Sequence, residues 1–282
     1  MIAFSIWPIN VYWYWIFYLF GFLIWYFFLK FIAKKKFFSK YKNLQNLLSN
    51  DIDSLLIYII LWVLLWGRLW EVFIYEWTYF SQHLLEIFAV WNGGMSFIWW
   101  ITWVFVSLLI MKKVKKLSNV EFFLLFDTLL VVVPLAIMLG RFWNYLNQEI
   151  YGLVVPINYR WINEFFVNIF TKTNIFHVYD LIDSNLRINT NFISIFFEWL
   201  VLFFILSILF FKKIKKKEIK PWIIIAYFLI FYSLFRFFIE YLRIDSQSQY
   251  VFLFTKSQRI FLIFILTGFV FMWNKKMKKI KL

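Results

Sequence analysis

Apolar stretches with the length of a membrane-spanning helix alternate with polar and basic segments along the chain. A helix of about 20 apolar residues crosses the hydrocarbon core of a bilayer. The pattern therefore predicts an all-α, polytopic membrane protein with seven transmembrane helices. These predicted helices lie near Val11–Ile32, Leu55–Tyr75, Met95–Met111, Val120–Leu139, Phe192–Phe211, Trp222–Leu242 and Ile260–Trp273.

Lysine clusters follow the first, third, fifth and seventh of these predicted helices. Loops rich in Lys and Arg stay on the cytoplasmic side of a membrane. All four clusters lie on that side if the N-terminus is outside and the C-terminus is cytoplasmic, so we predict this topology. The clusters are Lys34–Lys42, Lys112–Lys116, Lys212–Lys220 and Lys275–Lys281.

The longest segment outside the apolar stretches, residues 151–191, lies on the outer side of the predicted topology. It is too long for a simple loop, and its Ile, Phe and Asn residues follow no clear helical or strand period. We expect it to form a small extracytoplasmic subdomain, the arm, within a single membrane-embedded domain of residues 1–282.

Composition narrows the classes of function. The chain is 63% hydrophobic, which excludes an ordinary soluble domain. Its net charge of +15 comes from clusters between apolar stretches, so topology explains it and we expect no nucleic-acid partner. There is no Cys, and His83 and His177 lie far apart without neighbouring carboxylates. We therefore expect neither a metal centre nor a thiol nucleophile in this chain.

One polar island, Gly140 to Gly152, interrupts the outer end of the fourth apolar stretch. If it is helical, Arg141, Asn144 and Asn147 share one face. A guanidinium beside carboxamides suits a phosphate or ester head group. An ordinary helix end with an interfacial Arg is an equal alternative on this stretch alone.

The sixth apolar stretch carries Arg236, Glu240 and Arg243 at positions i, i+4 and i+7 of one helical face. Ionisable residues inside a membrane are costly and usually face a bundle interior or an aqueous site. A snorkelling Arg with an intrahelical ion pair is the alternative, and it suits Arg243. Two further charges, Arg68 and Glu198, also lie within apolar stretches.

The predicted topology places the arginines of these segments in the outer half of the membrane. Several arginines held by carboxylates suggest a site for an anionic lipid head group. A membrane enzyme or a lipid-handling protein needs such a site, and a cation channel does not. The arginines are Arg68, Arg141, Arg236 and Arg243.

At these residues the sequence resembles the prolipoprotein diacylglyceryl transferase family. The family signature reads roughly Gly-Arg-x-Gly-Asn-Phe-x-Asn-x-Glu-x-x-Gly, and Tyr145 occupies its Phe position. The signature residues present here are Gly140, Arg141, Asn144, Asn147, Glu149 and Gly152. Other segments similar to family motifs are Tyr14 in a Trp-Tyr element, Gly67-Arg68-Leu69, Gly93 to Phe97, Arg236 to Arg243, and Gln258.

The resemblance implies transfer of the diacylglyceryl group of phosphatidylglycerol to the lipobox cysteine of an exported prolipoprotein, in the bacterial cytoplasmic membrane and without a cofactor. It implies Arg141, Arg236 and Tyr14 as catalytic residues, the two arginines for the leaving phosphate. Asn144 and Asn147 would orient the head group, and Glu149 and Glu240 would fix the arginines. The remaining residues implied at the substrate site are Gly152, Arg68 and Arg243.

One departure concerns the base. The family continues its Gly-Gly-Met-Ser-Phe segment with His-Gly-Gly, and this chain has Ile98-Trp99-Trp100. Either the thiol is deprotonated by another route, with His177 or His83 as weak candidates, or the protein is impaired. Ile98 favours the alternative function, a non-catalytic lipid-binding or lipid-transport protein of the same fold.

The second departure concerns glycine. The chain has 7 Gly and 17 Trp, and Trp143, Trp99 and Trp100 occupy family Gly positions. Trp62 and Trp66, with Trp70, follow the i, i+4 spacing of small residues that let membrane helices approach. Our hypothesis is that the organism reads UGA as glycine and that the sequence was translated with UGA as tryptophan.

Overall fold

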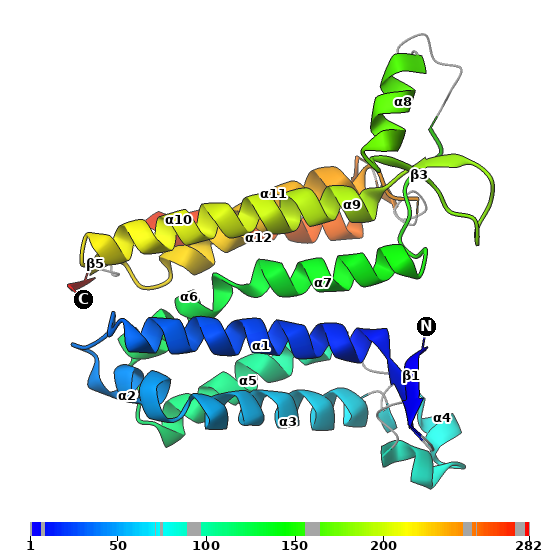
Figure 1. The fold of residues 1–282 in the computed structure, drawn as a ribbon. Helices are drawn as coiled ribbons and strands as arrows, with labels where there is room; N and C mark the ends of the chain where they lie inside the picture. Colours follow the sequence, from blue (N-terminus) through cyan, green and yellow to red (C-terminus); the bar gives the residue numbers. More distant parts are fainter. Residues whose placement is uncertain are drawn as a thin grey trace. The chain divides into compact units, whose positions relative to one another are not determined.

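The computed structural model describes residues 2–6, 9–70, 72–73, 76–88, 97–155, 164–244, 250–251, 253–273 and 280–281. It is mostly helical (Figure 1). The backbone divides into two compact units. Unit 1 comprises Met1–Trp15, Phe22–Leu125 and Leu282, and unit 2 comprises Ile16–Gly21 and Phe126–Lys281. The predicted single domain stays a prediction, and each unit is described by itself.

Unit 1 begins with an antiparallel hairpin and continues with helices. Its elements are β1 (Ile2–Ile6), β2 (Ile9–Tyr12), α1 (Trp13–Lys34), α2 (Lys42–Asn50), α3 (Ile52–Trp70), α4 (Trp77–Phe80), the 3₁₀ helix η2 (Leu84–Phe88), α5 (Phe97–Val114) and the start of α6 (Asn119–Leu130). Helix α3 packs along α5. Trp62 and Trp66 stack on α3 with ring centroids 6.0 Å apart.

A buried carboxylate fixes the amphipathic helix α2 in unit 1. Oε1 of Glu121 accepts hydrogen bonds from the backbone N–H groups of Asn43 and Leu44, both at 3.1 Å. Its Oε2 accepts from the N–H of Ser118 at 2.9 Å. A carboxylate at a helix N-terminus satisfies N–H groups that lack intrahelical partners and complements the helix dipole.

Unit 2 contains the rest of α6 and a set of long helices joined to the arm. Its elements are α7 (Val133–Leu146), α8 (Glu164–Lys172), β3 (Phe176–Val178), β4 (Leu186–Ile188), α9 (Thr190–Ser194), the π-helix η4 (Ile195–Val201), α10 (Leu202–Lys215), β5 (Glu218–Ile219), α11 (Ile223–Glu240), β6 (Tyr250–Val251), β7 (Phe254–Thr255), α12 (Lys256–Trp273) and β8 (Ile280–Lys281). Strand β3 pairs with β4, β5 with β8, and β6 with β7, all antiparallel.

Helices α11 and α12 pack closely because of one glycine. A Cβ at Gly268 would lie 2.6 Å from Cγ1 of Ile230 and 2.9 Å from the Ala226 carbonyl oxygen. Small residues allow such backbone approach between membrane helices. The start of α12 is fixed by a reciprocal cap, in which the Thr255 N–H donates to Oε1 of Gln258 and the Gln258 N–H donates to Oγ1 of Thr255. Nε2 of Gln258 also donates to the Phe237 carbonyl of α11 at 3.1 Å.

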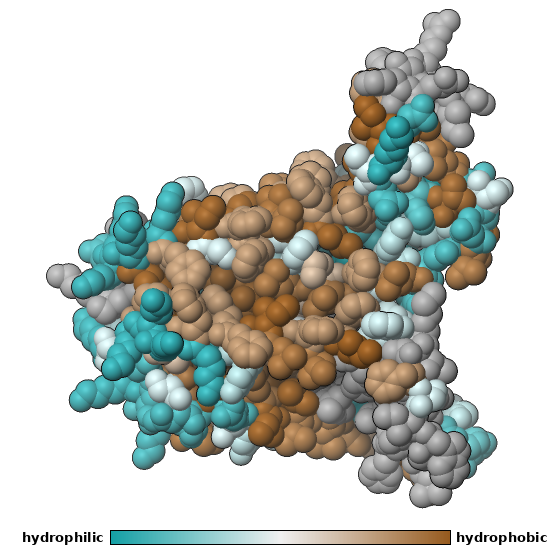
Figure 2. All heavy atoms as spheres, in the orientation of Figure 1, coloured by the Kyte–Doolittle hydropathy of each residue, from teal (hydrophilic) through white to brown (hydrophobic). Residues whose placement is uncertain are grey.

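Four helical stretches of the described chain are long and apolar enough to cross a membrane. They are Asn119–Leu146, Thr190–Lys215, Ile223–Glu240 and Lys256–Trp273. They correspond to the fourth to seventh predicted spans. Figure 2 shows apolar side chains over the middle of the α10 region, with hydrophilic residues gathered where α10 meets β5. The predicted total of seven spans and its topology stay predictions.

Two segments differ from the sequence prediction in detail. The fourth predicted span is divided between α6 and α7, with Pro134 in the first turn of α7. Proline lacks an N–H group and is tolerated at a helix start but not in a helix interior. In the arm, where we found no period, the described residues form α8 and the β3–β4 hairpin.

The N-terminus of α11 has an unusual backbone. Oδ2 of Asp127 accepts from the Trp222 N–H at 2.9 Å, and Oδ1 accepts from the Ile225 N–H at 3.0 Å. Trp222 adopts φ 75° and ψ 1°, in the left-handed region. A bulky residue is a strained outlier there, whereas glycine adopts this conformation readily.

Candidate active site

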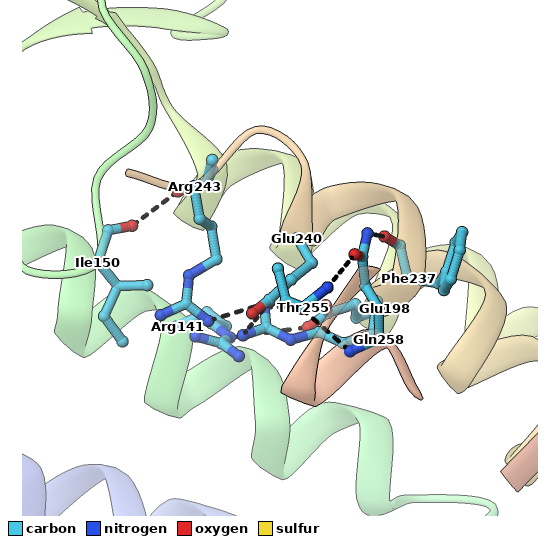
Figure 3. Close-up of polar contacts among 10 residues, drawn as sticks. Arg141, Ile150, Glu198, Phe237, Glu240, Arg243, Thr255 and Gln258 are labelled. Atoms are coloured by element: carbon cyan, nitrogen blue, oxygen red, sulfur yellow. Dashed lines mark hydrogen bonds and ion pairs between the residues drawn. The ribbon is translucent and has the colours of Figure 1, made fainter. Parts of the chain in front are cut away.

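Five charged side chains in unit 2 form an alternating chain of arginines and glutamates (Figure 3). Nε of Arg141 lies 3.7 Å from Oε2 of Glu198, and Nη1 of Arg236 lies 3.3 Å from Oε1 of the same glutamate. Oε2 of Glu240 lies 3.6 Å from Nη2 of Arg236 and 3.4 Å from Nη1 of Arg243. We call these five residues the arginine cluster.

Three separate elements bring the arginine cluster together. Arg141 comes from α7, Glu198 from the π-helix η4, and Arg236 and Glu240 from successive turns of α11. Arg243 lies three residues past the end of α11. A π-helix widens the backbone turn and is frequent at functional sites. Here it carries the carboxylate that joins α7 to α11.

Burial gives the arginine cluster its chemical character. The Glu198 side chain is 0% exposed, and that of Arg236 is 8% exposed. A buried charge is tolerated when it is paired with opposite charges. Three arginines face two glutamates, so the cluster carries one excess positive charge. Among the described residues, the guanidinium of Arg141 forms an ion pair with Glu198, and its Nη atoms donate no hydrogen bond. An anion would complement this edge.

The loop that follows α7 is held in a strained conformation. Gln148 and Ile150 have φ values of 55° and 56°. A β-branched residue in this region is a genuine outlier, and such strain persists only where the surroundings enforce it. Nδ2 of Asn191 donates to the Glu149 carbonyl at 2.7 Å, and Oγ1 of Thr190 donates to the Ile150 carbonyl at 2.6 Å.

Gly152 connects this loop to Arg243 by close backbone packing. Its N–H donates to the Ile188 carbonyl at 3.0 Å, and the Leu153 N–H donates to the Leu242 carbonyl at 3.0 Å. Gly152 also forms an antiparallel bridge with Arg243. A Cβ on Gly152 would collide with the carbonyl oxygens of Ile188 and Leu242. Glycine is therefore required here by the packing around Arg243.

The comparison with known proteins identifies the family. The model for the family described as prolipoprotein diacylglyceryl transferase matches residues 1–274. The chain belongs to the prolipoprotein diacylglyceryl transferase family. The resemblance that the motifs indicated is thereby confirmed, and the match covers every motif residue named above.

Relatives named phosphatidylglycerol–prolipoprotein diacylglyceryl transferase are similar over most of their length. The protein of Buchnera aphidicola subsp. Acyrthosiphon pisum (strain APS) is 31% identical over 291 residues, covering 99% of this chain and 96% of the relative. That of Rickettsia bellii (strain OSU 85-389) is 32% identical over 256 residues, covering 89% and 85%. That of Ehrlichia canis (strain Jake) is 29% identical over 274 residues, covering 96% and 94%.

Other signature residues of the family lie on α7 and in the loop that follows it. Asn144 accepts a backbone hydrogen bond from the Glu149 N–H at 2.8 Å. Nδ2 of Asn147 donates to Oε1 of Glu149 at 3.2 Å, and Glu149 is exposed. Glu149 was expected to fix an arginine. The carboxylate that holds Arg141 in the described residues is instead Glu198.

Two residues that the family resemblance implied belong to unit 1. Arg68 is buried, donating from Nε to the Ile87 carbonyl at 3.0 Å and from Nη2 to the Glu86 carbonyl at 2.6 Å. Its guanidinium lies 4.8 Å from the centre of the Phe80 ring. These contacts hold η2. Tyr14 lies in α1, and its side chain, like that of Ile98, is outside the described part of the structure.

The two histidines lie in different surroundings. The His177 ring packs 5.1 Å from the Tyr145 ring and 5.0 Å from the Tyr179 ring. Burial lowers the pKa of His177, and Asp180 opposes that shift. His83 stacks on Tyr79 at 4.4 Å and is exposed. His177 thus contacts α7 at Tyr145, which lies one helical turn after Arg141.

Glu198 is the site residue that sequence reasoning underused. It was recognised as an intramembrane charge but was given no role. A lone Glu in an apolar span must be paired to be tolerated, and that signal pointed to an arginine partner. Its particular partners, Arg141 and Arg236, depend on how η4, α7 and α11 pack.

Proposed function

We infer that the chain transfers the diacylglyceryl group of phosphatidylglycerol to the cysteine thiol of a prolipoprotein, an early step of lipoprotein maturation. Membership of the transferase family over residues 1–274 carries this conclusion. The arginine cluster supports it, because one excess positive charge matches the single negative charge of a phosphodiester. Family membership also favours the enzyme over a non-catalytic lipid-binding or transport protein.

The reaction forms one C–S bond and breaks one C–O bond. The thiolate attacks the glycerol carbon that is esterified to phosphate, and glycerol phosphate leaves with the electrons of the broken bond. We propose that Arg141 and Arg236 stabilise the negative charge that develops on this phosphate. Arg141 presents its Nη edge to the lipid, while Arg236, between Glu198 and Glu240, fixes the position of the cluster.

The other sequence-derived assignments form part of the same proposal. Asn144 and Asn147 orient the head group, and Arg243 supports it through Glu240. Gly152 admits the backbone approach that positions Arg243. Tyr14 donates to the head group, and Arg68 is a supporting residue. Glu149, which was expected to fix an arginine, instead accepts a hydrogen bond from Asn147, and we propose that it acts through that residue.

Thiol activation in this proposal needs no imidazole at Ile98. A cysteine thiol has a pKa of about 8.5, and neighbouring cations lower it because they favour the thiolate. The excess positive charge of the arginine cluster supplies this effect. The proton lost from sulfur ends on the departing phosphate, whose second pKa is about 6. This transfer completes the proton balance of the reaction.

We further propose seven transmembrane helices with the N-terminus outside, in the bacterial cytoplasmic membrane, and an extracytoplasmic arm of residues 151–191. Within unit 2, Glu198 lies in the first half of the continuous helical stretch Thr190–Lys215, and lysines occupy the last turn of that stretch. At a rise of about 1.5 Å per residue, Glu198 and Lys212 are about 20 Å apart along the helix axis. This separation suits a site near the outer leaflet and basic residues at the inner surface.

The test is direct transfer. Purified protein in phosphatidylglycerol vesicles receives a peptide with a lipobox cysteine, and the thioether product is sought by mass. Arg141→Ala should abolish product without loss of folded protein, whereas Arg259→Ala, at an exposed arginine of α12, should leave it. Lipid binding without any product in the unaltered protein would favour the non-catalytic alternative.

A further inference from the structure

The β3–β4 hairpin carries one buried arginine that the proposed chemistry does not use. Arg187 is 6% exposed. Its Nε and Nη2 donate to the two carboxylate oxygens of Asp183, with Nε and Oδ1 at 3.2 Å. Its Nη1 donates to the Gly152 carbonyl at 3.3 Å, and its guanidinium lies 5.0 Å from the Tyr151 ring centre. One side chain therefore grips three neighbours.

The segment that Arg187 grips is bonded on both of its edges. On the hairpin side, Val154 forms an antiparallel bridge with Arg187, and the Ile188 N–H donates to the Leu153 carbonyl at 3.0 Å. On the other side, the Leu153 N–H bonds to the Leu242 carbonyl and Gly152 bridges Arg243. The segment thus transmits the position of the hairpin to the end of α11.

We propose that Arg187, oriented by Asp183, is a positioning residue that sets Arg243 and Glu240 of the arginine cluster for the lipid head group. The inference rests on the proposed function of that cluster. Contacts carry it step by step, from Arg187 to Gly152, from Gly152 to Arg243, and from Arg243 Nη1 to Glu240 Oε2 at 3.4 Å.

The chemistry of this contact favours arginine over lysine. A guanidinium is a rigid fork that meets both oxygens of a carboxylate and still has a further N–H group for a carbonyl. A lysine ammonium cannot hold this planar arrangement. The Arg187 hydrogen bonds lower the pKa of Asp183 to about 2, so the ion pair persists at every pH at which the transfer would be measured.

The experiment is a double-mutant cycle between Arg187 and Arg243, with KM for phosphatidylglycerol and kcat as readouts. Arg187→Ala should raise KM about tenfold or more, the effect of losing a charged hydrogen bond. If Arg187 acts through Arg243, the double variant should lie within about threefold of the worse single variant. Arg187→Lys should rescue little, and Lys115→Ala, which breaks the Asp51 ion pair of unit 1, should change neither constant.

Thermal unfolding of each variant separates positioning from folding. Should Arg187→Ala fail to fold, Asp183→Asn replaces it in the cycle, because that change keeps the size of the side chain. The inference is overturned if the effects of the two changes multiply in the double variant, or if the variant at Arg187 leaves KM unchanged. If the unaltered protein forms no thioether, the proposed function fails instead, and the same cycle on binding to phosphatidylglycerol vesicles then decides the positioning role.

Discussion

Replacing Glu198 by Gln removes the carboxylate that Arg141 and Arg236 share. The amide keeps the size of the side chain and one oxygen that accepts from Nη1 of Arg236, now 3.3 Å away. On the other side, the amide NH2 group then faces Nε of Arg141 across 3.7 Å, donor against donor and without a negative charge. The arginine cluster then carries two excess positive charges in place of one.

The size of the effect follows from burial. Glu198 is 0% exposed, and removing one partner of a buried ion pair costs about 3–5 kcal/mol. Arg236 keeps Glu240 at 3.6 Å, which favours the lower end of that range. A loss of about 3 kcal/mol from the transition state slows transfer about 100-fold. Any share of the loss borne by folding lowers the midpoint of thermal unfolding instead.

The assay measures the initial rate of thioether formation and the unfolding midpoint on the same preparation. Glu218→Gln is the matched control, because Glu218 is exposed on β5 and lies outside the cluster. A Glu198→Gln protein that unfolds normally and turns over within about threefold of the unaltered enzyme would refute the shared-carboxylate reasoning.

Three further predictions concern single positions. Gly152→Ala should lower stability by about 1–3 kcal/mol, because its Cβ would overlap two carbonyl oxygens. Gly140→Ala is the control and should not lower stability, because its Cβ would meet nothing within 4 Å. Equal unfolding midpoints for the two variants would contradict this prediction. His177→Phe keeps the ring contacts and should retain turnover. Since burial lowers the pKa of His177, folding favours its neutral form. Stability of the unaltered protein should therefore rise with pH up to the unfolded value of about 6.5, and it should rise less in the variant; identical pH profiles of thermal unfolding would count against this. Mass spectrometry of the native protein should find glycine at position 222, and a UGG codon there would refute this.

Part of the arginine cluster could be predicted, because helical spacing alone shows which residues of one helix share a face. Arg236 and Glu240 lie one turn apart on α11. The i, i+4 spacing placed them on one helical face, and there they form an ion pair at 3.6 Å. The link through Glu198 could not be predicted in this way. It joins residues 38 positions apart in the sequence. In addition, the π-helix around Glu198 departs from the 3.6-residue period by which residues are assigned to one face of a helix.

The arm was less predictable for a different physical reason. Its strands β3 and β4 have 3 residues each, and α8 has 9. Elements this short have no stable period of their own and form through tertiary contacts. For the hairpin those contacts include the grip of Arg187 on Gly152, which depends on residues from two distant segments.

Trp222 shows a conflict between residue type and backbone, although its ring also makes an edge-to-face contact with Phe271 of α12, with the ring centroids 5.0 Å apart. Among the described residues, the other non-glycine residues with positive φ outside the loop of Gln148 and Ile150 are Lys36, Lys116, Asn174 and Lys217. Each lies two positions past the end of a helix. Helices commonly end with a left-handed residue just past their last turn, usually Gly and sometimes Asn. Trp222 instead precedes α11, where Asp127 accepts its N–H and so ties down its backbone. Glycine at position 222 removes the conflict and keeps the Asp127 hydrogen bond, since that bond uses the backbone alone. The left-handed backbone at position 222 is consistent with the translation hypothesis, which the codon at this position tests.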